Sequence, residues 1–280
     1  MLTRHLALVA DTKKVTPSQL TKVAAALQKQ ATRDFGHIWE IQANVSGFTN
    51  LEDVPTDYWP VIIRDDIKTP GAAGVHEDKN GQPFALVQYE KDWPLTASHE
   101  TLEMLGDPFG NRLVAGKSPK PGQGRVNFLV EVCDPSEDRQ FAYTVNGITL
   151  SDFYTPHYFD PVTAPSVRYS FTGAITKPRT ILRGGYLSWV VPQTNEWFQM
   201  IWFDTAEPVF RRLGVLSGKI TGSLRATIDR LTPTPLETVK PPPKSPLMAA
   251  ARDAVEEVDD SSSARADLLR KTIEEIKKAR

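Results

Sequence analysis

The chain has 280 residues, of which 40% are hydrophobic, so it is long enough for one large domain or two small ones with a buried core. Its formal net charge of −1 offers no basic surface for nucleic acid or an anionic membrane, so neither partner is expected. The single cysteine, Cys133, excludes an intramolecular disulfide framework. The sequence shows neither a signal-peptide pattern nor an apolar run near the roughly 18 residues of a membrane span. A soluble cytoplasmic protein is therefore expected.

The first hundred residues predict a strand, a helix, three more strands and a second helix. Thr16 can cap the first helix, since Pro17 suits its first position and Gln19 can complete a capping box. Gly36 is expected to end this helix. The second helix carries residues 98–107. Apolar runs and alternation predict strands over residues 5–10, 37–45, 58–63 and 84–89, with a turn-rich stretch over residues 71–82.

Beyond the second helix the sequence predicts shorter β elements. A loop rich in glycine and proline runs to Gly124. The dipeptide Asn146-Gly147 predicts a tight hairpin over residues 143–150, because both residues accept the positive φ angles of a type I′ turn. Further strands are expected over residues 126–133, 186–191 and 196–203, and a helix over residues 207–231.

A proline-rich segment divides the chain into three expected parts. Residues 1–231 are expected to form one domain, and residues 232–246 a linker that three consecutive prolines make stiff and extended. Residues 247–280 then form a charged, partly helical tail. This tail is either a solvated appendage or a helix that docks a protein partner.

The most informative stretch is an H-E-x-x-E motif that begins at His99. His99 and Glu103 are four residues apart on a helix, so they share one face, and zinc accepts both imidazole nitrogen and carboxylate oxygen. Glu100 stands where the zinc-peptidase signature H-E-x-x-H carries its general base, which activates metal-bound water. The alternative is an accidental pattern on a surface helix. His76-Glu77, in the turn-rich stretch, is interpreted as an example of such chance.

The best candidates for a further ligand are Glu131 and Asp134. Glu131 is predicted to lie inside an apolar strand, where an unpaired charge would be expensive to bury, so it should face a cation, a partner or water. In a strand Glu131 and Cys133 would share one face and Asp134 would take the other.

Other polar and aromatic positions are expected to be structural. Phe109 stands where the long metzincin motif has its last ligand, so that motif is broken. Asp107 is expected to be the polar end of the helix. Cys133 is expected to be a small core residue, and His157 to be packed among aromatic residues.

These residues also carry a family resemblance. The segment from Ser98 to Met104, the later Glu-Val-Cys-Asp segment and Asn146-Gly147 together resemble a group of uncharacterised bacterial and phage zincin-like proteins. They are more distantly similar to the plant EXORDIUM-type proteins, which pair a His-Glu-x-x-Glu helix with a later Glu-x-x-Asp segment. The resemblance implies a zincin-like α+β fold, with a mixed twisted sheet, an edge strand before the active-site helix, and later β-hairpins. The positions that it matches are His99, Glu100, Glu103, Glu131 and Asp134.

Two function hypotheses follow from these observations. The first is a zinc-dependent metallohydrolase of the peptidase class, whose peptide or protein substrate would add to an edge strand at residues 84–89 by main-chain hydrogen bonds. Oxygen-rich sites also suit calcium or manganese, so these ions stay open beside zinc. The second is a non-catalytic binding or assembly protein on the same fold, with a structural metal or none. A metal-free α+β protein is the remaining alternative.

Overall fold

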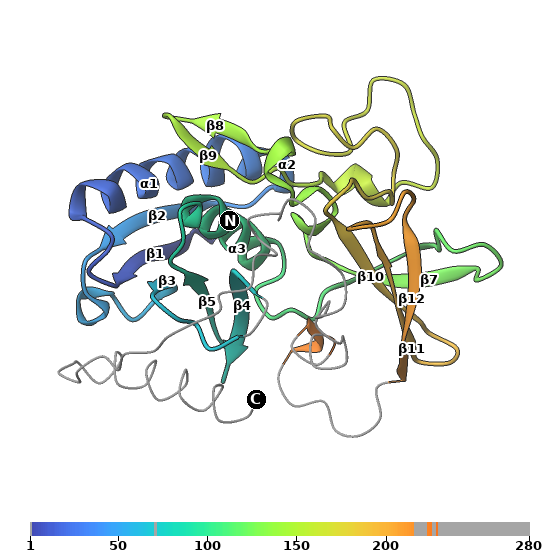
Figure 1. Ribbon diagram of the computed structural model, residues 1–280, viewed down its shortest axis with the longest axis horizontal. Helices are drawn as coiled ribbons and strands as arrows, with labels where there is room; N and C mark the ends of the chain where they lie inside the picture. Colours follow the sequence, from blue (N-terminus) through green and yellow to red (C-terminus); the bar gives the residue numbers. More distant parts are fainter. Residues whose placement is uncertain (1, 70–71, 216–222, 226–227, 229–280) are drawn as a thin grey trace.

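The computed structural model describes residues 2–69, 72–215, 223–225 and 228. It is an α+β structure with two five-stranded sheets, a two-stranded hairpin and two long helices. Figure 1 shows the first sheet on the left, the second sheet on the right and helix α3 near the centre. The predicted linker over residues 232–246 and the predicted tail over residues 247–280 lie outside the described residues.

The first sheet has the order β2-β1-β3-β5-β4. Its first four strands run parallel, and β4 pairs antiparallel with β5 at one edge. The parallel strands are nearly continuous apolar runs because both of their faces are covered. Leu6 and Leu8 of β1 point into the main core with the helices, whereas Ala7 and Val9 point into a smaller core on the other face. The strands are β1 (Arg4–Asp11), β2 (Ala43–Phe48), β3 (Tyr58–Arg64), β4 (Gly74–Lys79) and β5 (Gln82–Gln88).

Helix α1 (Pro17–Lys29) begins as predicted, with both hydrogen bonds of the capping box between Thr16 and Gln19. The chain then continues without a break through a π-helical segment, η1 (Gln30–Gly36), into the short α2 (His37–Trp39). The predicted strand over residues 37–45 is therefore wrong in its first half. The helical path persists until Glu40 adopts a left-handed conformation with φ of 55°, and β2 starts only at Ala43.

Helix α3 (Trp93–Gly106) occupies the middle of the molecule, and every one of its residues except Pro94 is buried. It packs against β3, β4 and β5 on one side and against the hairpin strand β9 on another. A helix that is buried all round belongs to the core rather than to a surface. Ser98 fixes its rotation, because its hydroxyl donates to Gln30 Oε1 at 2.7 Å and accepts the backbone N–H of Ser151 at 3.0 Å.

The second sheet is antiparallel throughout, in the order β12-β11-β10-β7-β6. The hairpin predicted at Asn146-Gly147 is confirmed, with φ angles of 51° and 78° at these two residues. The remaining strands are β6 (Leu113–Lys117), β7 (Arg125–Leu129), β8 (Tyr143–Val145), β9 (Ile148–Leu150), β10 (Tyr186–Val191), β11 (Glu196–Ile201) and β12 (Val209–Val215). The 3-10 turns are η2 (Leu51–Asp53), η3 (Asp134–Ser136), η4 (Arg139–Phe141) and η5 (Pro156–Phe159).

Two further predicted elements differ from the structure, and one predicted strand does not have the expected edge position. The helix expected over residues 207–231 is wrong at its start, because residues 209–215 form β12 and pair with β11. The turn-rich stretch over residues 71–82 contains β4, which turns into β5 through Asn80 and Gly81 with φ angles of 54° and 78°. Because β4 is the edge strand, residues 84–89 lie inside the sheet, and β5 has no edge to which a peptide could add.

In the part of the chain that the structure describes, every helix is too short or too polar to cross a membrane.

Candidate metal centre

Helix α3 presents its three motif residues to the interior of the molecule. His99 and Glu103 lie one turn apart, with 3.2 Å between His99 Nε2 and Glu103 Oε1. Their side chains are only 5% and 1% exposed. Glu100 is also buried, so the motif does not lie on a solvated helix surface. A buried carboxylate needs a partner that compensates its lost hydration.

The segment between β7 and η3 brings the second set of acidic residues to the helix. Asp134 Oδ1 lies 3.3 Å from His99 Nε2, and Glu131 is buried nearby. The prediction that Glu131 belongs to a strand is wrong, since β7 ends at Leu129 and Cys133 already has right-handed helical backbone angles. Alternation between faces therefore does not apply, and Glu131, Cys133 and Asp134 all approach α3.

Cys133 links this segment to the helix through two hydrogen bonds. Its backbone N–H donates to Glu103 Oε1 at 3.4 Å, which helps to orient that carboxylate. Its thiol donates to the backbone carbonyl of His99 at 3.8 Å. Burial raises the pKa of the Cys133 thiol, despite the nearby His99, so the thiol form is favoured. These contacts fit the prediction of a small core residue.

His76 is a site residue that the sequence interpretation missed. It lies on the edge strand β4, paired with Ala85 of β5, and faces the core that contains α3. Its Nδ1 lies 3.4 Å from Glu103 Oε2 and 3.6 Å from Glu100 Oε2. The Asn80-Gly81 dipeptide was the available signal, because it predicts a hairpin whose first strand contains His76.

Arg225 supplies a positive charge from a distant part of the chain. Its Nη1 lies 2.7 Å from Glu131 Oε2, 3.2 Å from Asp134 Oδ2 and 4.0 Å from Glu103 Oε2. Its Nη2 donates to the hydroxyl of Tyr186 at 2.6 Å. Local sequence patterns do not mark Arg225, because its partners lie far from it in the chain.

Opposite charges set the protonation of the two histidines. Burial alone would lower the pKa of His99, but Glu103, Cys133 and Asp134 together outweigh this effect, and the pKa lies well above the ordinary value. Burial opposes protonation of His76 in the same way, and Glu100 and Glu103 raise its pKa well above the ordinary value. Burial alone would raise the pKa of Glu103, but His99 and His76 hold it well below the ordinary value. Glu103 is therefore ionised and lies between the imidazoles of His99 and His76.

The pKa values of three other carboxyl groups are raised, whereas that of Glu103 is lowered. Burial raises the pKa of Glu131 well above its ordinary value, although the Arg225 charge lowers it. Burial together with the Glu103 charge raises the pKa of Asp134 to about 6. Burial and Asp134 raise the pKa of Glu137 well above its ordinary value. The centre thus holds more carboxyl groups than its basic side chains can neutralise, and a further cation would suit it.

The donor set fits a metal ion. Several buried atoms form no hydrogen bond, among them Glu103 Oε2, Asp134 Oδ1 and Glu131 Oε1. Tetrahedral bonds of 2.0–2.1 Å to zinc separate neighbouring ligand atoms by about 3.3 Å, close to the two spacings around His99 Nε2. Ligand-capable atoms lie within 4.8 Å of one another in four overlapping groups: His99, Glu103 and Cys133; His76, Glu100 and Glu103; His99, Asp134 and Glu137; and Glu103, Glu131 and Asp134.

The remaining sequence candidates lie apart from this centre. Asp107 forms the end of α3, as expected, and its Oδ2 accepts the backbone N–H of Arg112 at 2.6 Å. Phe109 is 43% exposed. The expectation that His157 is packed is wrong, because its side chain is 60% exposed and contacts Asp160. His157 lies within the 3-10 turn η5.

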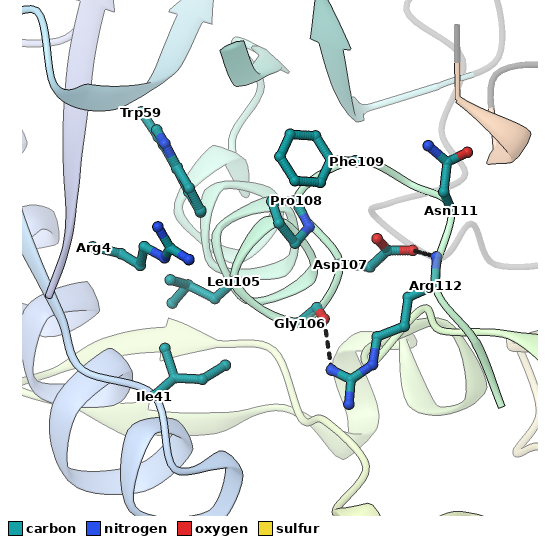
Figure 2. A pocket seen from close by; sticks show the side chains of 10 residues that line it. All are labelled: Arg4, Ile41, Trp59, Leu105, Gly106, Asp107, Pro108, Phe109, Asn111 and Arg112. Atoms are coloured by element: carbon teal, nitrogen blue, oxygen red, sulfur yellow. Dashed lines mark hydrogen bonds between the residues drawn. The ribbon is translucent and has the colours of Figure 1, made fainter. Parts of the chain in front are cut away.

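A cavity of about 480 Å³ lies beyond the C-terminal end of α3. Figure 2 shows Trp59, Phe109 and Arg112 among its lining side chains, with Arg112 donating to the carbonyl of Gly106 at 3.0 Å. The described residues of the metal centre do not line this cavity. The cavity and the centre are therefore separate features of the same helix.

No protein-family model matches the chain, and no curated protein and no solved structure is significantly similar to it.

Proposed function

We propose that this protein is a zincin-like metallohydrolase that acts on peptide bonds. His99, Glu103 and Asp134 are the ligands that we assign to its metal ion, and Glu100 is the general base. The observation that carries the proposal is the position of His99 Nε2, which lies 3.2 Å from Glu103 Oε1 and 3.3 Å from Asp134 Oδ1. These spacings suit atoms that share one metal ion.

The arrangement of the first sheet supports the proposal. The family resemblance implies an edge strand before the active-site helix, and β4 is an antiparallel edge strand that leads through β5 into α3. A peptide that added to β4 by main-chain hydrogen bonds would run beside the helix that carries His99. This corrects the expected docking strand from residues 84–89 to β4.

Each residue of the centre has a distinct role in this proposal. A zinc ion, when bound, polarises a substrate carbonyl as a Lewis acid and makes water more acidic. Glu100 follows His99 directly, and its carboxylate accepts the proton of the attacking water and passes it to the leaving amine. Glu131, which was expected to be a ligand candidate, pairs with Arg225 at 2.7 Å and instead holds that guanidinium beside Asp134.

The chemistry of the donor set bears on the identity of the ion. Two carboxylates would nearly neutralise a dication, which weakens its Lewis acidity, and oxygen-rich sites also bind manganese or calcium. Zinc is the ion that we assign, because the imidazole nitrogen of His99 is a borderline-soft donor.

A second candidate is a structural metal site on a non-catalytic protein. The observation that favours it is burial, because His99, Glu100 and Asp134 are 4%, 5% and 1% exposed and leave little room for a substrate. In this case the ion would stabilise the contact between α3 and the segment after β7 without any reaction.

Glu100→Gln separates the two candidates. The purified full chain would be loaded with zinc, its metal content measured, and its cleavage of an unstructured protein such as casein assayed. For the hydrolase, Glu100→Gln keeps one zinc per chain and lowers cleavage by at least about 100-fold, the usual contribution of a general base. Glu207→Gln, at an exposed glutamate on the surface, is the matched control and keeps full activity.

The outcomes have distinct meanings. Cleavage that is equal in wild type and Glu100→Gln contradicts the assigned base. A stoichiometric zinc that raises the melting temperature, without any cleavage by the wild type, favours the structural site. The absence of zinc binding by the wild type, with no effect of His99→Ala, overturns both.

A further inference from the structure

Strand β4 and helix α3 form a second group of ligand atoms beside the first. His76 is buried, with its Nδ1 3.4 Å from Glu103 Oε2 and 3.6 Å from Glu100 Oε2. Ligand-capable atoms of His76, Glu100 and Glu103 all lie within 4.8 Å of one another. This group contains no residue of the segment after β7, so α3 is the one element that it shares with the contact between His99 and Asp134.

Gly74 makes room for this arrangement. It lies two residues before His76 on β4, so both positions share one face of the strand. A Cβ atom at residue 74 would lie 2.5 Å from Glu100 Oε1 and 2.8 Å from Glu100 Cγ. The missing side chain therefore allows Glu100 to lie against β4, where its other carboxylate oxygen faces His76.

Glu103 offers its two oxygens to opposite sides. Oε1 is 3.2 Å from His99 Nε2, whereas Oε2 is 3.4 Å from His76 Nδ1 and has no hydrogen-bond partner. The residue is 1% exposed, and its Oε2 is held only by ion pairs at 3.4 Å to His76 and 4.0 Å to Arg225, so the lost hydration of this oxygen is incompletely compensated. Hydrolases with two metal ions hold them about 3.5–4 Å apart, a separation that one carboxylate can bridge.

We propose that His76, Glu100 and Glu103 form a second divalent-cation site, with Glu103 as the bridge to the first. This inference rests on the proposed function for the identity of the first site. The second site is the weaker one, because its ion shares Glu103 with another dication at close range and is repelled by it. It fills only when the cation is in excess.

Occupation of the second site would inhibit hydrolysis. A carboxylate oxygen that coordinates a cation cannot at the same time accept a proton from water. Glu100 would then bind the second ion instead of taking a proton from water. The same side chain would thus make the reaction possible at low cation concentration and block it at high concentration.

A zinc titration of the metal-stripped full chain tests this proposal. Native mass spectrometry counts the bound ions, and calorimetry gives the two affinities. The wild type is expected to bind two ions, with dissociation constants at least about tenfold apart. His76→Gln is expected to bind one ion, with the first affinity within about threefold of the wild type. His157→Gln removes an exposed histidine and is the control for adventitious surface binding.

A second variant tests the same site in case His76→Gln does not fold. Gly74→Ala leaves His76 in place but displaces Glu100, so it is expected to weaken the second ion and spare the first. Circular dichroism checks that both variants are folded. In an activity assay, excess zinc would inhibit the wild type but not His76→Gln.

The results separate this inference from the proposed function. A wild type that binds one ion and still requires Glu100 for cleavage keeps the proposed function and overturns the second site. Two ions retained by folded His76→Gln also overturn it. A wild type that binds no ion overturns both.

Discussion

Glu103 and Asp107 lie one turn apart on α3 and are buried to a similar degree, at 1% and 3% exposure. Asp107 is satisfied locally, since its Oδ2 accepts the backbone N–H of Arg112 at 2.6 Å. Glu103 instead lies among His99, His76 and Arg225, and its Oε2 lacks a hydrogen-bond partner. Burial of an acidic residue is therefore not the mark of a site. The mark is a buried carboxylate with one oxygen that forms no hydrogen bond, while side chains of other ligand types converge on it.

Replacement of the Glu103 carboxylate should have the largest effect on zinc affinity. Glu103→Gln is expected to weaken zinc binding by at least about 100-fold, because loss of a direct ligand costs more than loss of a supporting group. Asp107→Asn is the matched control one turn away and should bind zinc within about threefold of the wild type. Calorimetric titration of both variants measures the difference. Equal zinc affinity in Glu103→Gln and wild type would remove Glu103 from the centre.

Replacement of Arg225 should have an intermediate effect of opposite sign. Its guanidinium already neutralises Glu131 and Asp134, so it competes with a metal ion for their charge. Arg225→Gln is expected to tighten zinc binding by about tenfold, equivalent to about 1.4 kcal/mol. Arg212→Gln, which breaks an exposed ion pair with Glu196, is the control and should leave zinc affinity unchanged.

The metal-free Arg225 variant gives a second readout. Its melting temperature should fall, because removal of one partner from a buried ion pair leaves the other charges uncompensated. Weaker zinc binding by Arg225→Gln would mean that Arg225 organises the ligands rather than competing with the ion.

Substitution of Asp107 should have the smallest effect, and it should change only the free energy of unfolding. Asp107→Ala removes the acceptor for the backbone N–H of Arg112 and is expected to lower the free energy of unfolding by about 1.5 kcal/mol. Asp107→Asn keeps an acceptor oxygen and should recover most of this loss. Urea unfolding measures both values. A change in zinc stoichiometry in either variant would contradict the distinction between the two carboxylates.

The parts of the site that the sequence predicts are those fixed by local geometry. His99, Glu100 and Glu103 are placed by helical spacing alone, and the helix itself follows from its apolar pattern. The capping box at Thr16 and the Asn146-Gly147 turn are also local, and both occur as expected. None of these features depends on a contact that is distant in the sequence.

The parts of the site that the sequence does not predict depend on tertiary contacts. Strand β4 is polar along much of its length, as edge strands often are, so its composition resembles a turn. Its position brings His76 to α3 only once β4 pairs with β5. The apolar neighbours of Glu131 predict a strand, whereas in the structure those neighbours are buried in a connecting segment. Arg225 reaches the centre across more than ninety residues from Asp134, a contact that no local pattern predicts.

Helix α3 is enclosed on all sides and tied by Ser98 to Gln30 and Ser151. Its amide hydrogens should therefore exchange with deuterium only when the whole molecule opens, whereas those of the edge strand β12 exchange through local fraying. An ion bound at His99 and Glu103 stabilises the native state by mass action and would slow exchange along all of α3 together. The helix that carries the proposed chemistry is thus also the part of the chain whose protection reports the stability of the entire fold.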